Sequence, residues 1–367
     1  MLFATAMKRL LFARLSIPLA LPLVACYGGE RRNTGECPAG ETCSDQTPRG
    51  LDFIGNRLAG ELLLSGPRPT AIGGTQAIAL EYDRGDGVDV ALDLPFTADD
   101  DGGLGVKVES ALGSQVTVRG HGSRSNYLRI LDEDGLLMDR KELTGAALDQ
   151  IKLVSVDFES IPDGNPLAFA PGPRTIGVAL YGDVQKSGGP QSERLIDTSM
   201  DLQLSGAERT AWDALELNAT LGTHLLSVTA GDKPTAQLDV VVVSGADTLA
   251  AIAPPSSIPE MGTSTICFQA TSGGRYIVGL DWMYNVDGEV TEKGEGSLQR
   301  NCVTVSTQKT SGTVSIQASA GGQTTAMALT VSSTPRVGAS SAEHAPVRDT
   351  RALSHAVPTA GDRSAGQ

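Results

Sequence analysis

The chain has 367 residues, with 43 acidic against 29 basic side chains and a net charge of −14 at pH 7. A negative surface repels phosphate backbones, which argues against nucleic acid as a partner. Glycine is abundant, at 43 residues, and aromatic residues make up only 4%. Val, Thr, Ile and Leu fall in short alternating runs between Gly, Pro, Asp and Ser, a composition typical of small β-sandwiches.

Residues 1–25 have the pattern of a secretory signal peptide. Lys8 and Arg9 supply the positive start, and the uninterrupted apolar run from Leu15 to Val24 is ten residues long. A helix needs about 20 residues to cross a bilayer. The run therefore predicts export and cleavage rather than a membrane span.

The end of this segment, Leu23-Val24-Ala25-Cys26, resembles the lipobox of bacterial lipoproteins. The resemblance implies that Cys26 receives a diacylglycerol and a further acyl chain, and that it becomes the new N-terminus. Two or more acyl chains hold a protein stably on a membrane. Tyr27, where an aspartate would favour the inner membrane, favours the outer membrane, with the chain on its periplasmic or surface face. An ordinary secreted protein with a chance cysteine is the alternative.

The cysteine count agrees with lipidation, because five is an odd number for an exported chain. If Cys26 carries lipid, the other four form two even sets, Cys37 with Cys43 and Cys267 with Cys302. An oxidising compartment lets both pairs close. The first pair lies in a polar, Gly-rich stretch without further Cys or His, which predicts a small disulfide loop and argues against a metal site there.

Composition and periodicity divide the rest of the chain. The predicted organisation is a signal peptide (1–25), a lipidated tether with the small disulfide loop (26–50), three β-sandwiches (51–149, 150–243 and 244–333) and a disordered tail (334–367).

The first predicted sandwich has strands with one buried and one wet face. Ile78 and Leu80 alternate with more polar neighbours, and so do the apolar residues of the run from Val88 to Leu94. The pair Asp134-Gly135 separates two strand-like runs and predicts a tight hairpin turn.

The second predicted sandwich contains five expected strands. They are Ile151–Val156, Thr175–Tyr181, Asp197–Leu204, His224–Ala230 and Leu238–Val243. Ser205-Gly206-Ala207-Glu208 fits a capping box and predicts a short helix through Leu217. Leu215-Glu216-Leu217 fits a strand equally well, so both interpretations stay open.

An internal repeat relates the third sandwich to the second. Three pairs recur ninety positions later: Gly222-Thr223, Ala230-Gly231 and Thr235-Ala236 return as Gly312-Thr313, Ala320-Gly321 and Thr325-Ala326. Each copy predicts a strand, a Gly turn and a strand, and a repeat of this length is one immunoglobulin-sized module.

Residues 51–332 resemble the immunoglobulin-like domains of bacterial surface proteins, most clearly where Cys267, Trp282 and Cys302 follow one another. Trp282 shares a face with its apolar neighbours on an expected central strand, which predicts a core position. The two cysteines alternate with inward-facing residues such as Phe268, which places both on the wetter face. Their bridge is therefore expected to join neighbouring strands of one sheet, whereas in antibodies it crosses the core.

Two acidic patches are weak calcium candidates, because clustered loop carboxylates can supply the oxygens that calcium needs. The candidate ligands are Asp83, Asp86, Asp89, Asp99, Asp100 and Asp101. Their spacing matches no known calcium loop, so solvated turns are the default interpretation. Arg84-Gly85-Asp86 also spells an integrin-recognition tripeptide, which turn composition explains better.

Other candidate chemistry is sparse. Trp212 and Trp282 suggest sugar stacking, weakly, because so few aromatic residues are available. His121 lies in a Gly-rich turn without an identifiable orienting acid, and His224 is expected at a core edge. No Gly-x-Ser-x-Gly, His-Glu-x-x-His or Walker-type motif occurs.

The sequence thus predicts an all-β chain of tandem immunoglobulin-like sandwiches in a lipid-anchored outer-membrane protein. It would act without catalysis as a surface or periplasmic stalk or interaction protein, and its envelope partner is not identified by the sequence. A calcium- or glycan-binding adhesion module is the alternative. An enzyme of unknown type comes third, since triads assemble across a sequence.

Overall fold

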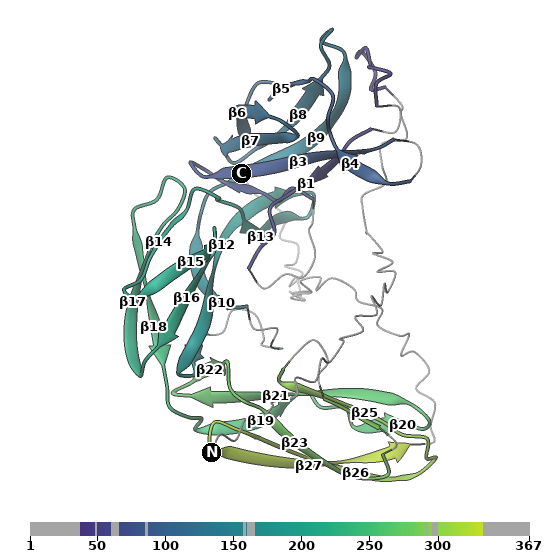
Figure 1. The fold of residues 1–367 in the computed structure, drawn as a ribbon, viewed down its shortest axis with the longest axis vertical. Coiled ribbons are helices and arrows are strands. Elements are labelled where there is room, and N and C mark those ends of the chain that lie inside the picture. Colours follow the sequence, from purple (N-terminus) through teal and green to yellow (C-terminus); the bar gives the residue numbers. More distant parts are fainter. Residues whose placement is uncertain are drawn as a thin grey trace, which may run out of the picture. The chain divides into compact units, whose positions relative to one another are not determined.

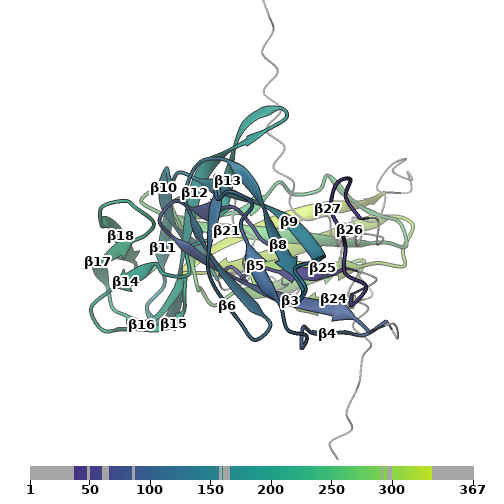
Figure 2. The ribbon, with the colours of Figure 1, turned by 90° about the horizontal axis from the view of Figure 1, so that it is seen from above.

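Figure 1 draws the protein as a computed structural model, and Figure 2 shows the same ribbon from above. The structure describes residues 37–47, 50–59, 66–84, 87–156, 159, 166–290, 292–295 and 300–332. Cys26, the predicted signal peptide and the predicted tail lie outside the described residues, and so do Gly85 and Asp86.

The regular elements in the described ranges are all β-strands, 27 of them. They form where apolar and polar residues alternate, because one face of each strand then packs on the core. Ile78 and Leu80, for example, are both fully buried at alternate positions of one strand. The part of the chain that the structure describes contains no helix with the length and apolar character needed to cross a membrane.

The first nine strands lie in residues 52–146. They are β1 (Asp52–Ile54), β2 (Thr70–Ala71), β3 (Thr75–Asp83), β4 (Asp89–Ala91), β5 (Thr97–Asp99), β6 (Val106–Leu112), β7 (Gln115–Gly120), β8 (Ser125–Leu131) and β9 (Leu137–Ala146). In one sheet, β1 pairs with one edge of β3. The other edge of β3 pairs first with β7 and then, further along, with β4, and β6 pairs with β7. The other sheet has the order β2-β9-β8-β5, with β2 parallel to β9.

The next nine strands repeat this pairing in residues 150–242. They are β10 (Gln150–Ser155), β11 (Leu167–Phe169), β12 (Gly172–Lys186), β13 (Gly189–Leu195), β14 (Asp201–Gln203), β15 (Ala207–Ala211), β16 (Ala214–Ala219), β17 (Gly222–Thr229) and β18 (Ala236–Val242). Here β12 has β10 on one edge and β16 followed by β13 on the other, while β11 is parallel to β18.

The last nine strands do the same in residues 248–332. They are β19 (Thr248–Ile252), β20 (Ser257–Pro259), β21 (Thr263–Ser272), β22 (Arg275–Val278), β23 (Met283–Gly288), β24 (Glu292–Glu295), β25 (Cys302–Ser306), β26 (Gly312–Ala320) and β27 (Gln323–Ser332). Strand β21 has β19 on one edge and β25 followed by β22 on the other, and β20 is parallel to β27. The two layers of this set are visible in Figure 1.

Three copies of one strand order, with the second strand of each copy crossing to pair in parallel with the last, define tandem immunoglobulin-like sandwiches. The predicted fold class is therefore confirmed. The first set packs around a core that includes Ile78, Leu128 and Ile130. The third set packs around Phe268, Val303 and Ile316.

The chain forms two compact units. Unit 1 comprises residues 1–56 and 64–146, and unit 2 comprises residues 57–63 and 147–367. Unit 2 contains both the second and the third set of strands, because β11 pairs with β22 as well as with β18 and so joins them in one nine-stranded sheet.

Unit 2 also includes a short segment from the N-terminal part of the chain. The backbone N–H of Ala59 donates to Asp213 Oδ2 at 2.6 Å, and Arg194 donates to the Ala59 carbonyl at 3.4 Å. The Cα of Gly177 has room for no Cβ, since one would meet the Ala59 Cβ at 3.1 Å and the neighbouring Val154 at 2.8 Å. The segment therefore packs on β12 at Gly177, where the missing side chain leaves room for Ala59.

Several local predictions have clear outcomes. Gly135 adopts φ 77° in the turn between β8 and β9, as the hairpin prediction requires. The open choice at Ser205–Leu217 is settled in favour of strands β15 and β16. The prediction for Val88 is wrong, because this residue is 57% exposed, whereas Leu92 of the same run is buried and its N–H donates to the Leu80 carbonyl at 2.8 Å.

Candidate functional site

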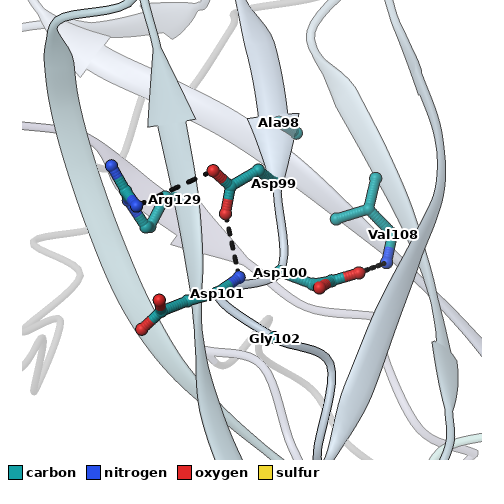
Figure 3. A pocket seen from close by; sticks show the side chains of 7 residues that line it. All are labelled: Ala98, Asp99, Asp100, Asp101, Gly102, Val108 and Arg129. Carbon is teal, nitrogen blue, oxygen red and sulfur yellow. Dashed lines mark hydrogen bonds and ion pairs between the residues drawn. The ribbon is translucent and has the colours of Figure 1, made fainter.

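An open hollow in unit 1 carries charged side chains. It is lined by Ala98, Asp99, Asp100, Asp101, Gly102, Val108 and Arg129, and has a volume of about 500 Å³. Strand β5 ends at its rim, and the turn that follows supplies the carboxylates, while Arg129 comes from the neighbouring strand β8 (Figure 3).

The carboxylates of this turn serve the turn itself. Asp99 accepts the backbone N–H of Asp101 at 2.8 Å and lies 3.8 Å from the Arg129 guanidinium. Asp100 accepts the backbone N–H of Val108 at 3.1 Å. Figure 3 shows the three acidic side chains pointing in different directions, so they do not converge on one point.

The calcium candidates are therefore not brought together. Calcium takes six to eight oxygens around one centre, and the described residues contain no group of three or more His, Cys, Asp or Glu side chains placed to hold a metal. Asp83 accepts the Gly87 N–H at 2.9 Å, Asp89 begins β4, and Asp86 lies outside the described residues.

The arginine of the Arg-Gly-Asp tripeptide is engaged within unit 1. Arg84 forms an ion pair with Asp93 and lies 5.8 Å from the centre of the Tyr82 ring. The Tyr82 hydroxyl donates to Asp93 at 2.9 Å, and this hydrogen bond, reinforced by the Arg84 charge, lowers the pKa of the Asp93 carboxyl. Arg84 therefore takes part in a surface ion pair, and its side chain stays 53% exposed.

The first disulfide loop is docked on unit 1. Cys37 and Cys43 are bonded, and Cys43 pairs with Leu137 at the start of β9. The backbone N–H of Ser44 donates to the Leu137 carbonyl at 2.8 Å, and the Leu137 N–H donates to the Thr42 carbonyl at 3.0 Å. A flexible tether with a small disulfide loop was expected over residues 26–50; the disulfide loop is present, and residues 42–44 pair with the edge of a sheet.

Two buried or half-buried charges hold this loop. Arg129 lies 3.4 Å from Glu41 while also facing Asp99. Asp132 is 3% exposed, and a hydrogen bond from the Ser44 side chain, together with backbone N–H groups of its own turn, lowers the pKa of its carboxyl. Sequence reasoning missed these contacts, although an Asp two residues before Asp134-Gly135 is a recognisable turn signal.

The second disulfide joins Cys267 of β21 to Cys302 of β25, directly opposite each other with Cα atoms 4.0 Å apart. This confirms a bridge between neighbouring strands of one sheet. The expected wet environment is wrong for one partner, because Cys302 is fully buried. The alternation of residues along a strand predicts on which face of the sheet a side chain lies, but not whether other residues cover that face.

The remaining candidates are dispersed. His224 Nε2 lies 2.7 Å from the Thr220 carbonyl, His121 is exposed in unit 1, and the tail histidines lie outside the described residues. Trp212 donates its indole N–H to the Arg57 carbonyl at 3.0 Å. Trp282 is partly buried against two apolar clusters, as a core position requires, but it precedes β23, which is an edge strand and not the expected central one.

The fold thus defines a tandem immunoglobulin-like protein, and its described residues contain no cluster of His, Cys, Asp or Glu placed to hold a metal. No protein-family model matches the chain, and no curated protein sequence matches it.

Several solved structures share the fold at low identity. Domains 4–9 of the surface-layer protein SbsC are 12% identical, over 78% of this chain and 48% of that one, with a TM-score of 0.25. The bacterial integrin-binding protein invasin is 12% identical, over 77% and 60%, with a TM-score of 0.21. An endo-fucoidan hydrolase of glycoside hydrolase family 107 is 12% identical, over 72% and 42%, with a TM-score of 0.21. The chain spans about half the length of the surface-layer structure, and similarities this distant indicate no function.

Proposed function

We propose that the protein is a cell-envelope lipoprotein, held at the outer membrane by lipid on Cys26, that works without catalysis as a stalk or interaction protein on the periplasmic or surface face. The observation that carries the proposal is Leu23-Val24-Ala25-Cys26 at the end of a short apolar leader. A leader of this length does not span a bilayer, so a lipid is the anchor that the sequence offers.

Two features of the described chain support this role. Both remaining cysteine pairs are bonded, as in chains that fold in an oxidising compartment. In the hollow, Asp99 and Asp100 accept backbone N–H groups of the chain itself, and Asp99 forms an ion pair with Arg129. A sandwich array of this kind presents surfaces and edges for contact, which suits spacing or display.

Replacing Cys26 by Ala tests the anchor. Lipid is attached through the thiol, so we expect the wild type to partition into a detergent phase and Cys26→Ala to move to the aqueous phase. Mass spectrometry of the wild-type N-terminus should show the acyl chains. Detergent partitioning of Cys26→Ala would place the anchor elsewhere and refute the proposal.

Tyr27→Asp is the matched control, because it changes the next residue and leaves the thiol. We expect this variant to stay in the detergent phase but to move from outer- to inner-membrane fractions in a two-membrane host. An aqueous Tyr27→Asp variant would show that the leader, and not the thiol, had been disrupted.

A further inference from the structure

Strand β11 belongs to the second set by its place in the chain, yet most of its backbone partners belong to the third. It pairs with β18 at one position, Phe169 opposite Val242, and with β22 at three, from Leu167 opposite Tyr276 to Phe169 opposite Val278. The ladder continues past the strand at both ends. The Tyr276 N–H donates to the Pro166 carbonyl and the Ala170 N–H donates to the Val278 carbonyl, each at 2.9 Å.

The same strand lies over a small apolar cluster that both sets share. Ala168 and Ala170 are buried together with Ala246, Ala270 and Ile277. Trp282, Leu280, Val241 and Val243 pack against this cluster. Alanines let the strands approach closely, and parting the two sets would expose this apolar surface to water, which is unfavourable.

Polar contacts hold the ends of the shared ladder. Glu159, from the segment between β10 and β11, accepts the Gly279 N–H at 3.0 Å at the end of β22. Burial, and secondarily the negative charge of Glu159, raises the pKa of Tyr284 in β23. Glu159 of the second set therefore lies close to two elements of the third.

Arg174 fixes the turn that follows β11. Its guanidinium donates to the carbonyls of Ala170 at 3.1 Å, Pro171 at 3.0 Å and Pro173 at 2.8 Å. Gly279 has φ 78°, and a Cβ there would lie 2.5 Å from Arg174 Nε. A side chain at position 279 would therefore displace Arg174 and loosen the turn.

We propose that the second and third sets of strands fold and open as one cooperative body, fused by β11 pairing with β22 and braced by Glu159 and Arg174. Two ordinary tandem domains with a flexible link would open independently. Here the backbone ladder runs without a break from β14 to β24, so opening of one set removes hydrogen bonds from the other. The inference does not depend on the membrane anchor.

Hydrogen exchange on the full-length chain tests this fusion, because the slowest amides report the opening of the whole cooperative unit. Val314→Ala removes two buried methyl groups from β26 in the third set, far along the chain from β11. We expect faster exchange, on the order of tenfold, for the protected amides of β26 and equally for those of β12 and β16 in the second set. Amides of β7 and β8 in unit 1 should not change.

Acceleration confined to the third set would overturn the proposal. The route of the coupling is tested by repeating Val314→Ala in two backgrounds: Glu159→Ala, which removes the acceptor of the Gly279 N–H, and Gly279→Ala, in which the added Cβ displaces Arg174. We expect the response of β12 and β16 to shrink relative to that of β26. A response of β12 and β16 that remains equal in both backgrounds would show that the brace does not carry the coupling.

Discussion

The indole N–H of Trp212 donates a hydrogen bond to the backbone carbonyl of Arg57, 3.0 Å away and 155 positions earlier in the chain. Next to it, Asp213 is 1% exposed and accepts the Ala59 N–H. Residues 57–59 lie between β1 and β2, and Glu159 lies at the equivalent place between β10 and β11. In both copies, this segment packs on the strands of the set that follows.

We expect Trp212→Phe to destabilise unit 2 by at least about 1 kcal/mol, the usual contribution of one hydrogen bond, because it removes the indole N–H that donates to Arg57 and replaces the indole with a smaller aromatic ring. Asp213→Ala should cost more, about 1 to 3 kcal/mol, since it leaves the partly buried Ala59 N–H without this acceptor. Denaturant unfolding followed by hydrogen exchange of β16 measures both.

The matched control is Asp213→Asn, which keeps an oxygen for the Ala59 N–H and should cost less than Asp213→Ala. Equal losses for the two Asp213 variants would mean that the hydrogen bond to Ala59 is not what the carboxylate contributes.

The Cys267–Cys302 bridge closes a ring of about 36 residues, for which loop entropy predicts a stabilisation of roughly 4 kcal/mol. We therefore expect Cys267→Ala with Cys302→Ala to lower the stability of unit 2 while keeping its fold. Alanine is the right replacement, because a serine hydroxyl at position 302 would be placed in a fully buried site.

Alkylation and mass spectrometry supply the check on this bridge. The native oxidised protein should present no free thiol at Cys267 or Cys302, and reduction under denaturing conditions should release both. A double-alanine variant with unchanged stability would contradict the loop-entropy estimate.

The sequence predicts what local alternation controls and fails where distant segments meet. Ile266 and Phe268 alternate with Cys267, and this period placed the bridge between neighbouring strands. The alternation of apolar and polar residues does not show which other segments cover a face of the sheet, and so the burial of Cys302 was not predicted. Leu167-Ala168-Phe169 is a short apolar run whose strand partners, β18 and β22, lie more than 70 and 100 residues further along the chain.

The candidate site shows the same limit. Asp99, Asp100 and Asp101 read as a possible ligand cluster because their spacing is local. Asp99 accepts the N–H of Asp101 within the turn, while the other partners come from outside it: the Val108 N–H of β6 donates to Asp100, and Arg129 of β8 forms an ion pair with Asp99. Only the folded chain reveals that these carboxylates are used to shape a turn.

Calcium is accordingly expected to leave unit 1 unchanged. A ligand present at a hundredfold over its dissociation constant would add about 2.7 kcal/mol to stability. We expect the melting temperature to be the same in millimolar calcium and in chelator, both for the wild type and for Asp99→Asn with Asp101→Asn. A rise with calcium that this double variant abolishes would restore the metal-site hypothesis.

We expect the raised pKa of Tyr284 to lower the stability of unit 2 at alkaline pH. Its hydroxyl donates to the Arg300 carbonyl at 3.1 Å, and burial followed by the charge of Glu159 raises its pKa above the ordinary value of about 10. Above about pH 10 the unfolded chain releases this proton while the folded chain keeps it, so the folded state binds more protons and stability falls as the pH rises. Below about pH 10 the contribution is fully present.

Fluorescence offers a direct measurement, because the only two tryptophans of the chain, Trp212 and Trp282, both lie in unit 2. Denaturant midpoints taken between about pH 8 and pH 11 should decline more gently for Tyr284→Phe than for the wild type, since phenylalanine has no proton to lose. Tyr82→Phe changes a tyrosine of unit 1 and should follow the wild-type curve. If Tyr284→Phe declines as steeply as the wild type, the alkaline loss arises from other groups, and the raised pKa of Tyr284 has no part in it.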